Sequence, residues 1–177
     1  MRTKLSLLIM TVASFALAGA SLAQTATQDI NLSANVSSYC TIADITNPAA
    51  LTAAIPVTEG VVDTTDITNT IASVACNSPA DIVATSLSGG VTTGGAAPTG
   101  TTNVLNYTGV ATFAGATSTI DTSATAGAAG SEAGNTATTA NAATGNLVVT
   151  VTPAQPSLPL APSAAYADTL QVTLTAQ

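Results

Sequence analysis

The sequence predicts an all-β protein built as an antiparallel β-sandwich. Apolar and polar residues alternate with a period of two in several segments, and the strand-favouring residues Val and Thr are abundant. Residues typical of turns separate these segments. No segment combines a period of 3.6 residues with helix caps, and Thr and Gly interrupt the Ala-rich stretches, which disfavours helix. Several short strands joined by turns are typical of a sandwich.

The expected strands follow one another along the chain at residues 30–36, 55–57, 67–76, 82–87, 104–113, 147–152 and 169–175. Pro56 interrupts the second of these, which therefore suits a sheet edge. The turn at Asn77-Ser78-Pro79 and the Gly/Thr/Pro loop at 91–102 separate strands. Residues 153–162 are rich in proline and are expected to be extended or irregular.

The first and the last of these expected strands each have one apolar face. Near the N-terminus, one face of the expected strand carries Ile30, Leu32, Ala34 and Val36. In the last strand, one face carries Leu170, Val172 and Leu174. By contrast, residues 123–145 contain almost only Ala, Gly, Thr, Ser and Asn, so a long flexible loop between two strands is expected there.

The first 23 residues have the pattern of a secretory signal peptide. Arg2 and Lys4 form a positive start, residues 5–17 are apolar, and small residues precede a cut between Ala23 and Gln24. The apolar run is shorter than the roughly 20 residues that span a membrane, and no later segment could cross as a helix. A retained N-terminal anchor is the alternative. We expect one exported domain, residues 24–177, located in the periplasm, at the cell surface or in the medium.

Basic residues are confined to that leader. The chain has two Lys or Arg, nine Asp or Glu and no His. Nucleic-acid binding needs basic side chains against phosphate, and Ser-His-Asp or Cys-His catalysis needs a histidine. Most zinc sites need His or several Cys. We therefore expect no nucleic-acid partner, no cofactor, no metal and no enzymatic activity.

Two cysteines, Cys40 and Cys76, remain after the leader is removed. An even number in an exported chain indicates a disulfide, and closing a loop of this length contributes about 3.8 kcal/mol in the chain-entropy model. A metal or redox pair is the alternative, but the C-x-x-C spacing and any further ligand are missing.

Other possible sites are weak. Glu59, Asp63 and Asp66 could form a glycosidase pair or a calcium site, although neither spacing is specific and such carboxylates are usually solvated. The glycine pairs 89–90 and 94–95 lack the lysine and the strand-to-helix context of a phosphate loop, so a hairpin loop is favoured.

Three features together resemble a known group of exported proteins. An alternating segment leads into Cys40, the motif Val74-Ala75-Cys76-Asn77 holds the second cysteine, and Tyr166-Ala167-Asp168-Thr169 leads into the last strand. The combination resembles the spore coat protein U group and the related pilins of archaic chaperone–usher systems. The likeness covers most of the chain loosely, and its C-terminal motif is the most specific part.

The resemblance implies an incomplete immunoglobulin-like sandwich that lacks one strand and leaves an apolar groove. A periplasmic chaperone fills the groove first, and the N-terminal extension of another subunit then replaces it at an outer-membrane usher. The extension here is residues 24–39, with Ile30, Leu32, Ala34 and Val36 as the donated side chains. Tyr166, Leu170, Val172 and Leu174 would form the core of the final strand. Whether residues 24–36 are donated or form the subunit's own first strand stays open at this point.

Two hypotheses for function follow. The first is a secreted structural subunit of a surface pilus or coat, assembled by strand donation and acting in adhesion or biofilm formation. The alternative is a monomeric exported binding module with a self-complete sandwich, for which the few aromatic residues offer little sugar stacking. An enzyme that uses two carboxylates is the least favoured reading.

Overall fold

The computed structural model describes residues 33–42, 53–124, 130–162 and 165–177, and every regular element in them is a β-strand. The predicted all-β class is therefore confirmed. The chain divides into two units, residues 1–35 and 36–177. Of the first unit, residues 33–35 are described, and they are exposed and outside any strand. The account below concerns the second unit.

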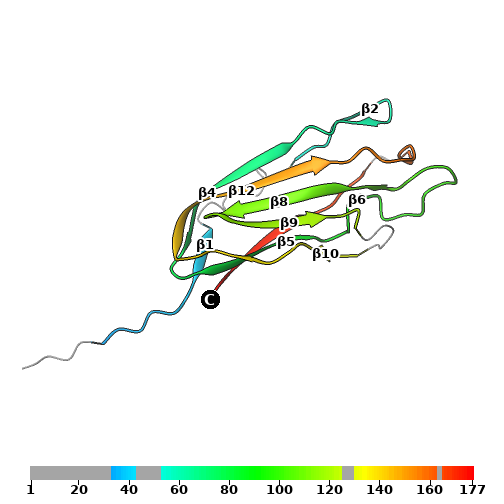
Figure 1. Cartoon of the computed structure of the whole chain (residues 1–177). Coiled ribbons are helices and arrows are strands. Elements are labelled where there is room, and N and C mark those ends of the chain that lie inside the picture. The colour runs from blue at the N-terminus through cyan, green and yellow to red at the C-terminus, as the bar shows by residue number, and fades with distance from the viewer. Residues whose placement is uncertain (1–32, 43–52, 125–129, 163–164) are drawn as a thin grey trace, which may run out of the picture. The chain divides into compact units, whose positions relative to one another are not determined.

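One layer of this unit is a five-stranded sheet in which all neighbours run antiparallel (Figure 1). Its strands, in spatial order, are β1 (Cys40–Ile42), β4 (Ile67–Cys76), β12 (Ala143–Pro153), β8 (Tyr107–Phe113) and β9 (Ala116–Asp121). A register shift between Gly145 and Leu147, opposite a left-handed Ser73, marks a bulge between β12 and β4.

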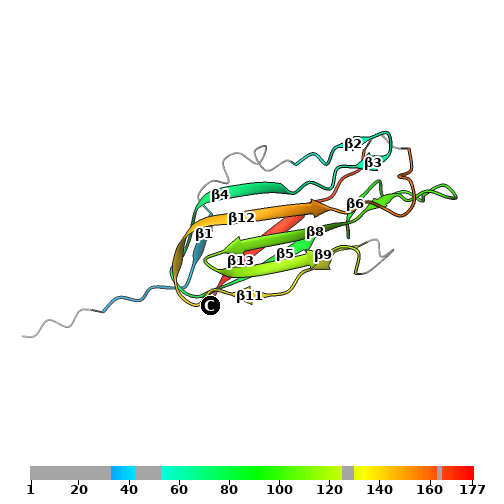
Figure 2. The same ribbon diagram turned by 45° about the horizontal axis from the view of Figure 1, so that its top comes forward.

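The second layer is centred on β5 (Ala80–Ser86), which pairs along its whole length with β13 (Leu170–Ala176). The other edge of β5 pairs with two short strands, β10 (Glu132–Ala133) and β11 (Ala137–Thr138) (Figure 2). Two small hairpins complete the described structure: β2 (Val57–Thr58) with β3 (Val61–Val62), and β6 (Val91–Thr92) with β7 (Val104–Leu105).

The core lies between the two layers. Ile82 and Ala84 of β5 pack in one buried cluster with residues of the five-stranded sheet, which contributes Val74, Ala111, Phe113, Ile120 and Leu147. Burial alternates strictly along β5 and β8, since successive side chains of a strand point to opposite faces. The two sheets therefore pack face to face as a sandwich of apolar inner faces.

The longest predicted strands are confirmed. The segment 67–76 is β4, 147–152 lies within β12, and the last strand is β13. The segment 82–87 overlaps β5, and 104–113 is divided between β7 and β8. In the segment 104–113, Leu105, Tyr107, Ala111 and Phe113 are all buried.

Other predictions need correction. The flexible loop expected over 123–145 is wrong for β10, β11 and the first residues of β12, which pair with β5 and β4. No strand was expected between Phe113 and this loop, where the structure has β9. The edge strand expected at 55–57 lies later, as β2. In the segment 30–36, residues 30–32 fall outside the described residues, and residues 33–36 are not in a strand.

Candidate functional site

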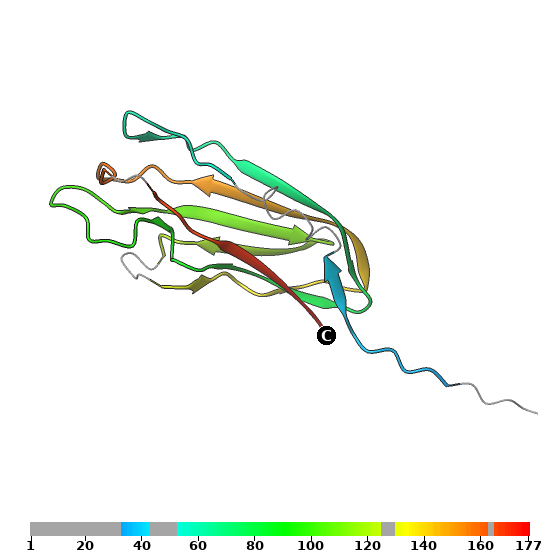
Figure 3. The same cartoon turned by 180° about the vertical axis from the view of Figure 1, so that it is seen from behind.

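An open groove lies between the two sheets beside β13. Within the described residues, β13 has β5 as its strand partner and presents its other edge unpaired. In the facing sheet, β1 pairs with β4 at residues 74–76, so the outer edge of β4 from Ile67 to Ile71 also lacks a described strand partner. Figure 3 shows β13 in red, crossing the layer that holds β4, β12 and β8. Two unpaired edges therefore border one gap in the sandwich.

The groove has a volume of about 760 Å³ and a mainly aliphatic lining. Its walls come from β4, β12 and β13, with further residues from β1, the segment before β2, β6 and β8: Ile42, Ala53, Ile55, Ile67, Asn69, Ile71, Val91, Tyr107, Leu147, Val149, Val151, Asp168, Thr169, Leu170, Gln171 and Val172. Such a lining suits alternate apolar side chains of an extended segment, whose backbone could pair with the free edges.

The burial of inward side chains shows that the groove walls are only partly covered. The inward residues of β5 are fully buried, including Ile82 and Ala84. The corresponding residues of β13, Leu170 and Val172, are only half-buried although they pack on the same core cluster. Ile67 and Ile71 of β4 are half-buried as well. The inner face of the five-stranded sheet thus extends beyond the narrower sheet that should cover it.

The opposite side of the sandwich is closed. The segment 130–139 runs between β5 and β9 and bonds to both: Gly134 N–H donates to Ala84 O (2.8 Å), and Asn135 N–H donates to Thr119 O (3.1 Å). The Asn135 side chain continues the pairing, because its Oδ1 accepts from Thr119 N (2.7 Å). Gly134 fits only because it has no side chain, since a Cβ there would lie 2.4 Å from Thr119 O. One side of the sandwich is therefore sealed and the other is open.

A carboxylate network closes one end of the groove. Asp168 precedes β13, and its Oδ2 accepts hydrogen bonds from the hydroxyls of Ser86 (2.6 Å) and Tyr107 (2.7 Å). Its Oδ1 accepts from the backbone N–H of Ser88 (3.0 Å) and Thr169 (2.7 Å). Burial raises the pKa of the Tyr107 phenol, and the adjacent Asp168 carboxylate raises it further. These bonds connect β5, β8 and the start of β13.

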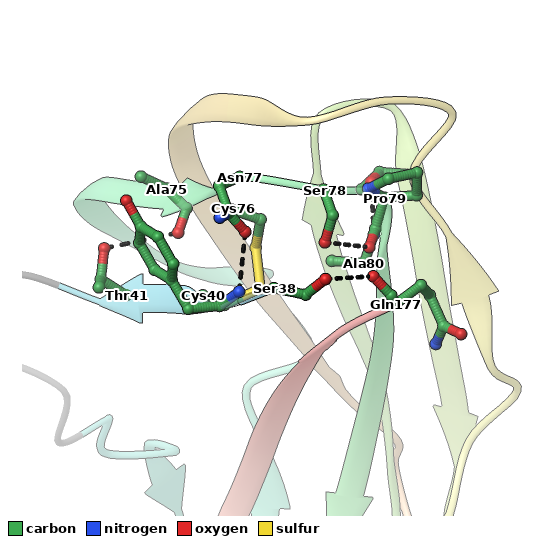
Figure 4. The surroundings of a disulfide bond; sticks show 12 residues. Ser38, Cys40, Thr41, Ala75, Cys76, Asn77, Ser78, Pro79, Ala80 and Gln177 are labelled. Atoms are coloured by element: carbon green, nitrogen blue, oxygen red, sulfur yellow. Dashed lines mark hydrogen bonds between the residues drawn. A yellow bond between two sulfur atoms is a disulfide. The ribbon is translucent and has the colours of Figure 1, made fainter. Parts of the chain in front are cut away.

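The far end of β13 is held near the disulfide. Cys40 and Cys76 are bonded and lie directly opposite each other in the β1–β4 pair, so the predicted disulfide is confirmed. Close by, Ser38 Oγ donates to Gln177 O (2.7 Å), and Gln177 N–H donates to Pro79 O (2.8 Å) (Figure 4). The chain is therefore fixed at residue 38, just after the segment predicted to be donated.

The predicted site residues fall into two groups. Leu170, Val172 and Leu174 lie in β13 and pack on the core, as expected for the final strand. Tyr166 lies before β13, and its hydroxyl bonds to Thr102 O and Ala161 O, so it anchors loops rather than the strand core. Of the predicted donor residues, Ile30 and Leu32 fall outside the described residues. Ala34 is exposed, and Val36 is 74% exposed.

The acidic residues near β3 have local roles. Asp63 Oδ1 accepts from Thr65 N (2.9 Å), and the hydrogen bonds from Thr65 lower the pKa of this carboxyl. Asp66 Oδ1 accepts from Thr152 Oγ1 (2.5 Å). Among the described residues, no three His, Cys, Asp or Glu side chains converge in a way that could hold a metal ion.

The sequence analysis missed the groove walls on β4 and β12, the role of Asp168 and the seal at Asn135. The isoleucines of β4 carried a usable signal, since Ile67 and Ile71 lie on the same face of a strand and such an apolar face needs a covering partner. No described helix is long and apolar enough to cross a membrane. Comparison of the chain with family models, with curated proteins and with solved structures found no match.

Proposed function

We propose that this chain is a secreted structural subunit of a surface pilus or coat, assembled by β-strand donation. The observation that carries the proposal is the aliphatic groove between β13 and β4, whose facing edges have no strand partner in the described part of the chain, on a sandwich whose opposite side is sealed. Edge strands with exposed backbone groups are usually covered or blocked in stable monomers. Here one edge is blocked by residues 130–139, and the other borders a cavity of about 760 Å³.

The strand order supports the same proposal. The order β1-β4-β12-β8 in one sheet and the pair β5-β13 in the other correspond to strands A-B-E-D and C-F of an immunoglobulin-like sandwich. Among the described residues, no strand pairs with the other edge of β13, where strand G would pair with F. We therefore propose an incomplete immunoglobulin-like fold in which a strand from outside the sandwich takes that place.

The occupant that fits is the N-terminal segment of a second copy. β13 has seven residues, the same length as the segment from Ile30 to Val36. The apolar residues of that segment recur every second position, so they would enter the aliphatic groove together, while Asn31, Ser33 and Asn35 face outward. Burying Ile30, Leu32 and Val36 would each contribute about 1.5–3 kcal/mol.

The first strand of the sandwich begins after the segment that we propose is donated. β1 begins at Cys40, and residues 37–39 are tied to Asn77 and Gln177. The subunit therefore does not need residues 24–36 for β1, which leaves them available to another subunit. Before assembly at an outer-membrane usher, a strand of a periplasmic chaperone would occupy the same groove. The finished fibre would act in adhesion or biofilm formation.

The experiment compares two triple variants of the exported chain. In the test variant, Ile30, Leu32 and Val36 are each changed to Asn; in the matched control, Asn31→Ser, Ser33→Asn and Asn35→Ser alter only the polar face. We expect detergent-resistant ladders from the wild type and the control, and monomers from the test variant. Wild-type chain that stays monomeric, with slow hydrogen exchange at residues 30–36, would instead identify a self-complete binding module.

A further inference from the structure

Asp168 joins the two sheets at one end of the groove. Asp168 precedes β13, which belongs to the sheet of β5. The hydroxyl of Tyr107, in β8 of the opposite sheet, donates to Asp168 Oδ2 (2.7 Å). Tyr107 is 3% exposed and Ser86 is fully buried, so water does not compete freely for these bonds. Ser86 is itself fixed, because its Oγ accepts from Gly89 N (2.9 Å) and Gly90 N (3.1 Å). The carboxylate therefore has rigid donors on both sides of the sandwich.

An empty apolar groove tends to close, because its walls gain contacts and lose exposed surface when they approach. Any such closure would move β13 toward β4 and β12. The Tyr107–Asp168 bond opposes that movement at one end of β13, and the bonds of Gln177 to Pro79 and Ser38 hold the other end. The strand is thus held at both ends, and its first residues, Leu170 to Val172, border the cavity.

We propose that Asp168 is a positioning residue that, through Tyr107, holds the empty groove in the form that accepts a strand. This inference rests on the proposed function of the groove and adds to it the residue that prepares the site. Only the open form would bind, so the measured affinity falls in proportion to the fraction of open molecules. Loss of the Tyr107 hydroxyl would lower that fraction without removing any group that must pair with the incoming backbone.

The test uses the full exported chain with Ile30, Leu32 and Val36 changed to Asn, so that it accepts a strand but does not donate one. The probe is a labelled peptide of residues 24–36. We expect Tyr107→Phe to slow association and weaken affinity about tenfold, as loss of one hydrogen bond to a charged group implies. The matched control is Tyr166→Phe, which removes a hydroxyl bonded to Thr102 O and Ala161 O away from the groove. Its affinity should stay within about twofold of the parent.

The readouts separate the possible failures. A merely structural Tyr107 would lower the melting temperature and leave peptide affinity and association rate equal to those of the parent, which would overturn the inference alone. A parent chain that does not bind the peptide would overturn the proposed function together with the inference. We expect Asp168→Asn, like Tyr107→Phe, to slow association of the peptide and weaken its affinity. This second variant provides the test if the Tyr107 variant does not fold.

Discussion

Asn135 pairs with Thr119 in the manner of a neighbouring strand. The Asn135 N–H donates to Thr119 O (3.1 Å), and the Asn135 Oδ1 accepts from Thr119 N (2.7 Å). One residue therefore satisfies both backbone groups of Thr119 at the outer edge of β9. On the other side of the sandwich, β13 and the first part of β4 have no such cover among the described residues, and the proposed strand addition is assigned to that side.

Gly134→Ala tests how tightly this seal is packed. The added Cβ would lie 2.4 Å from the backbone oxygen of Thr119, so the segment or β9 must shift. We expect a loss of about 1–3 kcal/mol in the free energy of unfolding, measured by urea denaturation. Gly130→Ala is the control, because a Cβ there meets nothing within 4 Å. Equal stability of the two variants would show that the seal is loose.

Asn135→Ala tests the side-chain part of the seal. The Thr119 N–H would lose its partner at an exposed site, where water can replace it, so the expected cost is about 1 kcal/mol. Hydrogen exchange at Thr119 should accelerate at the same time. Asn141→Ala, an exposed change just after the sealing segment, should leave that amide unaffected. An unchanged Thr119 amide in the Asn135 variant would contradict the assigned role.

The Cys40–Cys76 bond closes a loop that contributes Ile42, Ala53, Ile55, Ile67, Asn69 and Ile71 to the groove wall. Replacing both cysteines by Ala should reduce the free energy of unfolding by about 2–5 kcal/mol and lower the exported yield. The double change avoids leaving a reactive thiol. Reduction of the wild-type chain should shift the urea midpoint in the same direction. A midpoint that is insensitive to reductant would rule out a stabilising bond.

Tyr107 is expected to make the free energy of unfolding fall at alkaline pH. Burial raises the pKa of its phenol, so the unfolded chain, whose phenol titrates near pH 10, loses its proton first. This contribution to stability is complete below about pH 10 and is lost progressively as the pH rises toward the folded pKa. We expect Tyr107→Phe to flatten the alkaline fall in urea midpoint and Tyr166→Phe to retain it. Identical alkaline profiles for the wild type and Tyr107→Phe would contradict this origin.

Sequence reasoning was most successful where one strand face carries large apolar residues. β4 was predicted as a candidate strand from Ile67 to Cys76, followed by the turn at residues 77–79, and the structure has it with the same bounds. β9 was missed because two of its three inward residues are small, namely Ala116 and Ser118 beside Ile120. Such positions show little hydrophobic periodicity, yet they are buried because the neighbouring segment lies close.

The site was less accessible to sequence reasoning because it depends on tertiary relationships. The half-buried Leu170 and the fully buried Ile82 have similar local patterns, and only the sheet order shows that Leu170 has no described strand on one side. The two hydroxyl donors to Asp168, on Ser86 and Tyr107, come from segments more than 60 residues away. No local pattern predicts that convergence.

The most direct test of strand donation is hydrogen exchange, measured separately in assembled material and in dissociated monomers. Our account predicts that residues 30–36 and β13 exchange slowly together in the assembled material, and that residues 30–36 exchange rapidly in the monomer. Residues 30–36 that are already protected in the monomer, or that stay unprotected in the assembled material, would contradict it.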